Sequence, residues 1–174
     1  MKHLIKKMLK EDIETHLDCI VEALNNPINV TLNKTDYGYE GNFDIDKNHY
    51  LITIEDMTEN DCCFIFKFSM NNSFDLVNDV RKAFSVIPTI RNVVETFIET
   101  HKPKLFIFNK SDSSKGRERV YNEFSNELSK KYGYNRSVRS IDNNVLYMLS
   151  NNLNKDNYLT SLEYLLKNYG DFTD

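Results

Sequence analysis

Few residues of this chain have the type and spacing that chemistry requires. Glu55, Asp56, Glu59 and Asp61 gather near a turn and could bind a cation, although their spacing is not that of a calcium loop. A solvated hairpin tip is the favoured interpretation. Cys63 could act as a nucleophile, but the sequence places no base beside it. A buried cysteine that packs as a small hydrophobe is favoured instead.

The histidines and the basic residues carry weaker signals. His49 and His101 have no partner in a recognisable catalytic triad. The later part of the chain is locally basic, through Arg117, Arg119, Lys130, Lys131, Arg136 and Arg139. This basic region could contact phosphates or an acidic protein surface, but scattered solubilising charge is the favoured interpretation.

Composition limits the possible function classes. The chain has 174 residues, 40% hydrophobic and 28% charged, with a net charge of -4. The acidic balance argues against a broad nucleic-acid surface, so a nucleic-acid partner is not favoured. The three cysteines, Cys19, Cys62 and Cys63, form a poor disulfide framework, which indicates a reducing compartment. No Cys/His spacing resembles a zinc site, and we expect no metal.

The chain carries no membrane or secretion signal that we recognise. No apolar run approaches the length that spans a bilayer, so no membrane partner is expected. The basic, amphipathic start lacks an uninterrupted apolar segment and a small-residue cleavage site. We therefore expect no secretion by a signal peptide.

Hydrophobic periodicity predicts the elements that must position these residues. The first half reads as a helix over 4–24, followed by short strands within 28–34, 37–45, 50–54 and 62–70. Segment 71–83 is ambiguous between a strand with a loop and an irregular helix start. The second half predicts a helix over 88–101, a buried strand over 105–108 and a helix over 117–132. The chain then shows weak strand character at 138–141, a strand over 145–149 and a helix over 158–169.

These elements predict an α+β fold with a central, mostly antiparallel mixed sheet flanked by helices. We expect a single domain over 1–174, with a core over about 4–150 and an extra C-terminal helix over about 155–170.

The order of elements resembles the GNAT (Gcn5-related N-acetyltransferase) fold. The run RERVYNEFSNELSKKYGY is similar to the GNAT ending, with Tyr121 on a helix that leads to Gly133 and Tyr134. The runs FDLVNDVRKAFSVIPTIRNVVETFI, KPKLFIFN and GRERVYNEF resemble an uncharacterised tailed-phage protein family with a GNAT-like core. This resemblance covers the middle and later parts of the chain.

The resemblance implies roles for individual residues. Tyr121 matches the tyrosine that serves GNAT enzymes as general acid toward the leaving thiolate, which makes it the candidate catalytic residue. Its spacing from Val120 and Phe124 equally suits a core-facing tyrosine, which is the favoured interpretation. Arg81 and Lys82 could supply charge to the acyl-CoA pyrophosphate and are the candidate cofactor-binding residues.

The acyl-CoA loop of the family is altered in this chain. Consecutive backbone N–H groups approach the pyrophosphate only where glycines allow it, and none of the five glycines lies between Met70 and Pro88. Val80, Phe84 and Val86 would crowd such a loop.

Three functions follow as expectations. The favoured one is a phage-encoded, GNAT-like binding or assembly component, acting in the virion or on a host factor in the host cytoplasm. It would need no cofactor and would bind a phage or host protein. The alternative is a divergent N-acyltransferase that uses acetyl-CoA. The third, a small nucleic-acid binder, is disfavoured by the acidic balance.

Overall fold

A computed structural model describes residues 27–45, 47–58, 60–71, 80–110, 115–141 and 144–169. Within helices and strands, the side chains of 80–85, 110, 115–119, 141 and 169 are not described. The expected first helix, the loop before α2 and Glu59 lie outside the described residues. The strands are β1 (Asn33–Thr35), β2 (Gly38–Ile45), β3 (Asn48–Asp56), β4 (Cys63–Met70), β5 (Leu105–Lys110), β6 (Asn135–Ile141) and β7 (Asn144–Ser150). The helices are α2 (Val80–His101), α3 (Lys115–Tyr132) and α4 (Lys155–Tyr169).

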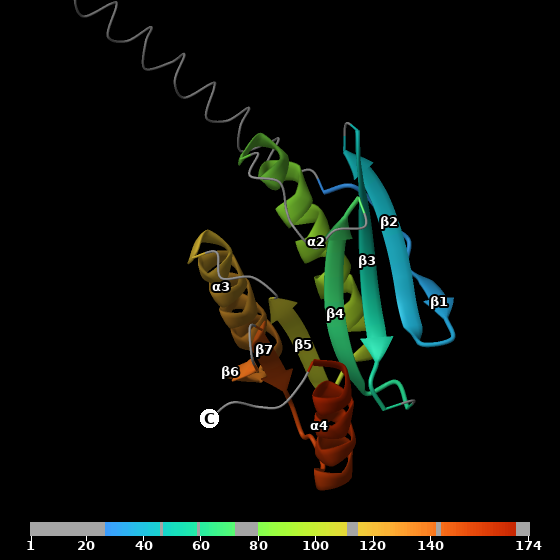
Figure 1. Cartoon of the computed structure of the whole chain (residues 1–174), viewed down its shortest axis with the longest axis vertical. Helices are drawn as coiled ribbons and strands as arrows, with labels where there is room; N and C mark the ends of the chain where they lie inside the picture. The colour runs from blue at the N-terminus through green and yellow to red at the C-terminus, as the bar shows by residue number, and fades with distance from the viewer. Residues whose placement is uncertain are drawn as a thin grey trace, which may run out of the picture.

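The fold is α+β, and its strands form a seven-stranded mixed sheet in the order β1-β2-β3-β4-β5-β7-β6 (Figure 1). Strands β1 to β4 form an antiparallel meander. Strand β5 lies parallel to β4 because the chain crosses back through α2, and β7 and β6 extend the sheet antiparallel. The predicted α+β class and mostly antiparallel mixed sheet are therefore confirmed.

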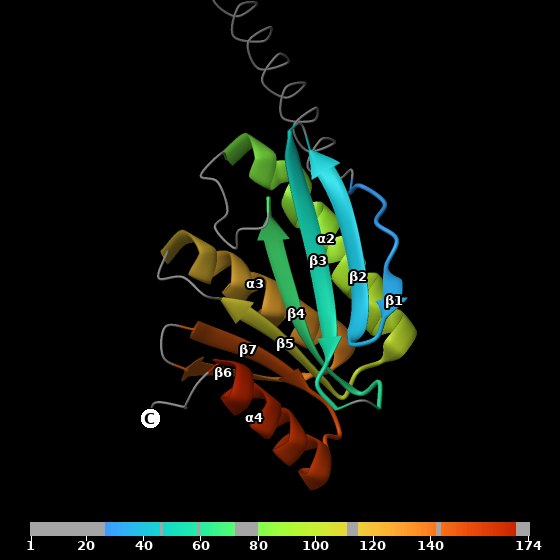
Figure 2. The ribbon, with the colours of Figure 1, turned by 45° about the vertical axis from the view of Figure 1, so that its right-hand side comes forward.

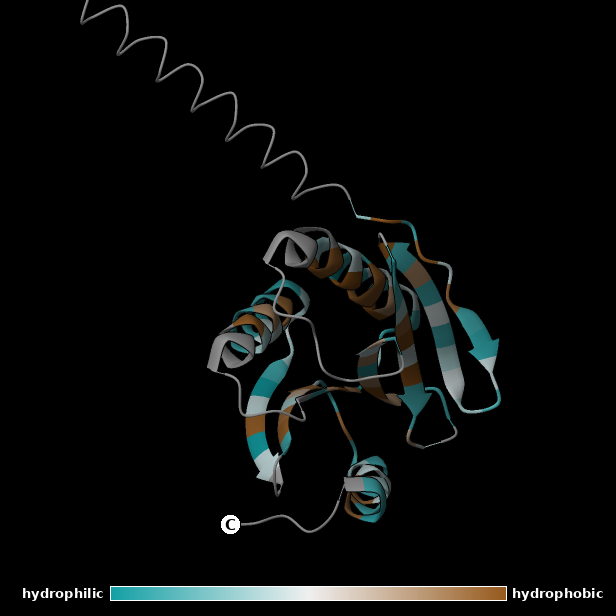
Figure 3. Ribbon diagram, turned by 45° about the horizontal axis from the view of Figure 1, so that its top comes forward, coloured by the Kyte–Doolittle hydropathy of each residue, from teal (hydrophilic) through white to brown (hydrophobic). Residues whose placement is uncertain are grey.

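Burial of side chains explains the strand pattern. In β3, Tyr50, Ile52 and Ile54 are buried and alternate with half-exposed neighbours, so one face of this strand packs on a core. Strand β4 is buried on both faces except at Lys67, as expected for a central strand. Figure 3 shows the alternating brown and teal bands that this pattern produces along the strands.

One turn depends on glycine. Gly38 begins β2 with a φ of +142°, a region that L side chains rarely adopt, and a Cβ there would lie 2.1 Å from the Ile54 carbonyl oxygen. The tight β1–β2 connection therefore requires the absence of a side chain at this position.

Helix α2 begins earlier than the sequence predicts. The expectation was a start near Pro88, because proline is tolerated in a first turn. The helix instead begins at Val80 and contains Pro88 in its interior. Burial on the sheet compensates for the lost hydrogen bond, since Val86, Val93, Val94 and Phe97 on either side of Pro88 are buried.

Two apolar clusters hold the layers together. The first lies between the sheet and α2 and α3, and it includes Phe64, Phe97 and Leu128. The second lies on the opposite face under α4 and includes Ile65, Ile107 and Leu165. Figure 2 shows α2 and α3 behind the sheet and α4 in front of it.

Two strand predictions needed correction. Of the expected strand 28–34, only positions 33 and 34 lie in a strand, β1 (Asn33–Thr35). Tyr37 lies in the turn, 65% exposed, instead of sharing the core face. The weak signal at 138–141 belongs to a full strand, β6, which pairs with β7 along its length. Among the described helices, none is both long and apolar enough to cross a membrane.

Candidate functional site

Strands β4 and β5 separate at the end of their pairing. They pair in parallel at only four positions, from Cys63 with Leu105 to Phe66 with Phe108. Beyond these, β4 continues with β3 to Met70, and β5 continues with β7 to Lys110 (Figure 2). We call residues 67–70 and 109–110 the β4–β5 divergence. Carboxyl ends of parallel strands followed by helices are a common place for ligands, so the candidate site lies here.

Apolar side chains line the divergence on the α2 and α3 face. Phe66, Phe68 and Met70 of β4 are 3%, 8% and 5% exposed, and Phe108 of β5 is 1% exposed. The rings of Phe66 and Phe108 lie 5.7 Å apart, and the Phe124 ring from α3 lies 5.3 Å from that of Phe108. On this face the described walls are therefore closed to solvent.

A polar cluster lies on the opposite face. The Lys67 ammonium donates to both carboxylate oxygens of Glu55, at 2.7 and 2.6 Å, and the Tyr164 hydroxyl of α4 donates to the same carboxylate. The side chains of Lys67 and Glu55 are only 25% and 19% exposed. This half-buried ion pair therefore joins two strands and α4, and its charges satisfy one another.

Asn109 of β5 directly follows the last parallel pair, Phe66 with Phe108. Its side-chain oxygen is buried and has no hydrogen-bond donor among the described residues. A buried acceptor without a donor costs about 1–3 kcal/mol, so this atom marks a place where a ligand N–H or O–H would be stabilised. The sequence did not identify the Lys67–Glu55 pair or the role of Asn109. The available signal was a lone lysine within the apolar strand Cys63–Met70.

Tyr121, the candidate catalytic residue, lies on α3 and is half-buried. Its ring stacks on that of Tyr147 in β7, with centroids 5.8 Å apart and planes at 22°, and it packs against the first apolar cluster. The ring is thus part of the α3–sheet interface, and its role as an acid stays a prediction.

Arg81 and Lys82, the candidate cofactor-binding residues, lie in the first turn of α2. The early start of the helix places them after the loop and not within it. Their side chains lie outside the described residues, so the prediction for them stays untested.

Several residues of the basic region already make contacts within the chain. Lys131 of α3 pairs with Glu95 and Glu99 of α2. Arg136 donates from Nε to the Ser125 hydroxyl at 2.8 Å and from its guanidinium to Asn122, and it lies over the Tyr147 ring. Lys131 and Arg136 are therefore engaged within the chain. This weakens the case for a phosphate-binding face.

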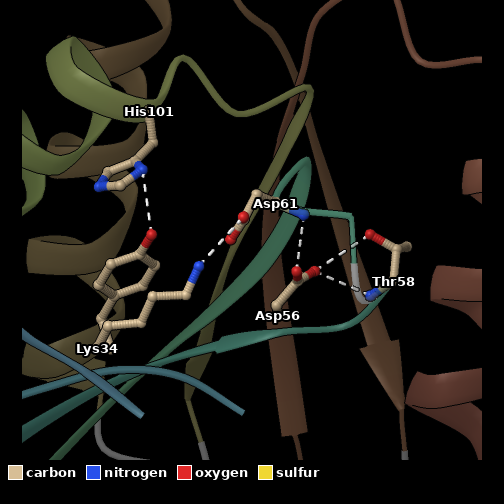
Figure 4. A network of polar contacts seen from close by, with 6 residues as sticks. Lys34, Asp56, Thr58, Asp61 and His101 are labelled. Atoms are coloured by element: carbon tan, nitrogen blue, oxygen red, sulfur yellow. Dashed lines mark hydrogen bonds and ion pairs between the residues drawn. The ribbon is translucent and has the colours of Figure 1, made fainter. Parts of the chain in front are cut away.

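A second polar network lies where β1, the β3–β4 turn and the end of α2 meet (Figure 4). His101 Nδ1 and the Tyr39 hydroxyl are 3.4 Å apart, and Lys34 pairs with Asp61. Burial lowers the pKa of His101, an effect that the Asp61 carboxylate opposes. Burial also raises the pKa of Tyr39, and Asp61 adds to that change. Within the described residues, neither ring contacts the third group that a catalytic relay needs.

The described carboxylates of the acidic turn bind donors from the chain itself. Asp56 accepts hydrogen bonds from the backbone and hydroxyl of Thr58 and from the backbone N–H of Asp61 (Figure 4). Glu55 faces Lys67 and Asp61 faces Lys34. Within the described part of the chain, no group of three or more His, Cys, Asp or Glu side chains is arranged to hold a metal ion.

The adjacent cysteines Cys62 and Cys63 have structural roles. Cys63 is fully buried in the second apolar cluster, and burial raises the pKa of its thiol to about 12. The thiol therefore stays protonated at neutral pH and is a poor nucleophile. Its sulfur lies 3.3 Å from that of Cys62, and both cysteines are free thiols.

Comparison with known proteins gives no match: no protein-family model, no curated protein and no solved structure matches this chain. The case for any function therefore depends on the geometry of the site.

Proposed function

We propose that this chain is a GNAT-like protein that acts as a non-catalytic binding or assembly component. The order of elements supports the GNAT-like part: an antiparallel meander leads into α2, and a strand, a second helix and closing strands follow. The splayed strands β4 and β5 support it further, because a GNAT-like sheet is splayed at its pocket. In this proposal α4 is an addition to the core.

The main observation in support of a non-catalytic role is the burial of the side chains that line the β4–β5 divergence. A ligand groove gains affinity by burying ligand surface against open apolar walls. Phe66, Phe68, Met70 and Phe108 are between 1% and 8% exposed, so they have little surface left to offer a thioester arm. An acyl-CoA would first have to displace packed aromatic rings, and this displacement opposes its binding.

The start of α2 supports the same conclusion. Pyrophosphate binding at a helix N-terminus needs backbone N–H groups that nothing shields. The first turn of α2 contains Val80, Arg81, Lys82 and Ala83, without a glycine, and Val86 in the next turn is buried in the first cluster.

The partner in this proposal is a protein. The sequence resemblance of the middle and later segments to a tailed-phage family implies that this partner is a component of the phage particle or a host factor. Among the described side chains, the half-buried charges nearest the divergence are Lys67 and Glu55, and they pair with each other and not with a small anionic ligand.

Calorimetry with acetyl-CoA tests the proposal directly. We expect no binding heat up to millimolar acetyl-CoA and no thiol release with pooled amines, because the walls are closed. An active GNAT enzyme under the same conditions is the positive control. Micromolar affinity for acetyl-CoA would overturn the non-catalytic assignment.

The second candidate function is a divergent N-acyltransferase, and Asn109 is the observation that favours it. Its buried oxygen lacks a donor among the described residues at the point where the strands separate, and a ligand amide N–H would supply one. In this alternative Tyr121 acts as the acid, so Tyr121→Phe should lower thiol release at least ten-fold. Replacement of the exposed Tyr158 by Phe is a control, since it removes a hydroxyl from α4, outside the α3–sheet interface. Unchanged turnover in Tyr121→Phe contradicts the assignment of the acid.

A further inference from the structure

The two edges of the sheet differ in how they are protected. The β1 edge is only three residues long and carries Lys34. At the other edge, β6 extends over seven residues, and among the described strands it pairs only with β7. Short strands and charged side chains, lysine above all, are devices by which proteins prevent edge-to-edge pairing, so the β1 edge is protected.

The β6 edge is protected less well, by the charges of Arg136 and Arg139 alone. Its sequence, NRSVRSI, contains neither proline nor lysine, and its register with β7 runs without interruption from Asn135 to Ile141, so no bulge turns the edge away. Val138 at its centre is 42% exposed. A long, regular edge with an exposed β-branched residue is suited to pair with another strand.

We propose that β6 pairs antiparallel with β6 of a second copy of this chain, about a twofold axis at Val138. This register places Val138 opposite itself, Arg136 opposite Ser140 and Ser137 opposite Arg139 of the second copy. Each arginine thus faces a serine, and the two valines form an apolar pair at the axis. The interface is self-complementary, as a twofold dimer requires.

The arginines do not oppose this pairing. Arg136 is held on its own molecule by Ser125, Asn122 and the Tyr147 ring. Arg139 is exposed and lies on the other face of the strand, where the opposite position is a serine. Like charges directly opposite one another would destabilise a strand pair, and this register contains none.

The solution mass of the full chain is the first test. Sedimentation equilibrium across the micromolar range should give a mass twice that of one chain. A mass of one chain throughout this range would overturn the proposal. This inference does not rest on the non-catalytic assignment, because β6 lies at the sheet edge beyond β7, away from the β4–β5 divergence.

Charge variants at the axis test the register. Val138→Glu and Val138→Lys each place two like charges directly opposite one another, and each should weaken the dimer about ten-fold. An equimolar mixture of the two variants should restore dimer formation, because Glu then faces Lys. This rescue separates loss of pairing from loss of folding, which circular dichroism also monitors.

Val120 provides a matched control. It is a valine of similar exposure, 40% against 42% for Val138, and it lies on α3. Val120→Glu and Val120→Lys should leave the dimer unchanged. Dimers that persist in both Val138 variants, or variants whose mixture stays monomeric, would overturn the pairing of β6 with β6.

Discussion

Tyr134 shows how a single side chain joins distant turns. It follows Gly133, whose φ of +71° reverses the chain after α3, and its hydroxyl donates to the Pro103 carbonyl at 2.8 Å. Burial raises the pKa of Tyr134 to about 12, because the ionised form would be poorly solvated. Tyr134 thus ties the turn after α3 to the turn after α2.

Removal of this hydroxyl should destabilise the fold without altering its packing. In Tyr134→Phe the buried Pro103 carbonyl loses its donor, which should lower the free energy of unfolding by about 1–3 kcal/mol. Urea denaturation measures this change. Tyr158→Phe is the control, since Tyr158 is 45% exposed and its substitution should change stability by less than about 0.5 kcal/mol. Equal effects of the two substitutions would contradict the structural role of Tyr134.

At the scale of elements, α4 is attached to the sheet by apolar and polar contacts together. Leu165 is buried against Ile107 and Leu146 in the second cluster. Beside them, the Tyr164 hydroxyl reaches the Glu55 carboxylate that also binds Lys67. The polar contacts fix the position of a helix that apolar burial alone would hold less specifically.

A double-mutant cycle on this pair tests that view. Lys67→Met leaves the half-buried Glu55 carboxylate with one fewer partner and should lower the free energy of unfolding by about 1–3 kcal/mol. The double variant Lys67→Met/Glu55→Met should recover part of this loss, because no unpaired charge remains. Chemical denaturation of the wild type, Lys67→Met, Glu55→Met and the double variant gives the coupling energy.

An exposed ion pair supplies the comparison for this cycle. The side chains of Lys34 and Asp61 are 65% and 52% exposed, so solvent screens their pairing, and Lys34→Met should change stability by less than about 0.5 kcal/mol. A coupling energy of Lys67 and Glu55 near zero would show that the pair contributes nothing beyond packing.

For the whole molecule, His101 makes stability depend on pH. Its ring stacks on Phe97, with centroids 4.4 Å apart, and burial lowers its pKa in the folded state. An unfolded histidine has a pKa of about 6.5, so the unfolded chain binds the proton more tightly. The contribution of His101 to stability is therefore present above pH 6.5 and is lost as the pH falls below that value.

Thermal unfolding between pH 7.5 and pH 5 measures this dependence. His101→Phe keeps an aromatic ring against Phe97 and Tyr39 but cannot be protonated, so its melting temperature should fall less than that of the wild type. His49→Gln, at an exposed histidine paired with Asp44, controls for general effects of histidine removal. The prediction fails if His101→Phe and the wild type lose stability in parallel as the pH falls.

The sequence predicts elements well where periodicity is strong. Apolar residues at both odd and even positions predict strand β4, and this strand is the buried centre of the sheet. The sequence predicts the start of helix α2 near Pro88, because proline is common in a first turn, whereas the helix begins at Val80. Strand β6 gave only a weak signal, since an edge strand with both faces exposed lacks alternating burial.

Local pattern alone thus determined the α+β class, the meander and the buried strands, because burial imposes a period on apolar residues. Tertiary structure decided what occupies the candidate site. The closed aromatic walls of the β4–β5 divergence and the Lys67–Glu55–Tyr164 contact join residues from separate strands and a distant helix. The exposure of the β6 edge likewise depends on the strand order, which places β7 between β5 and β6. No spacing along the chain encodes these contacts, since they arise only when the sheet assembles.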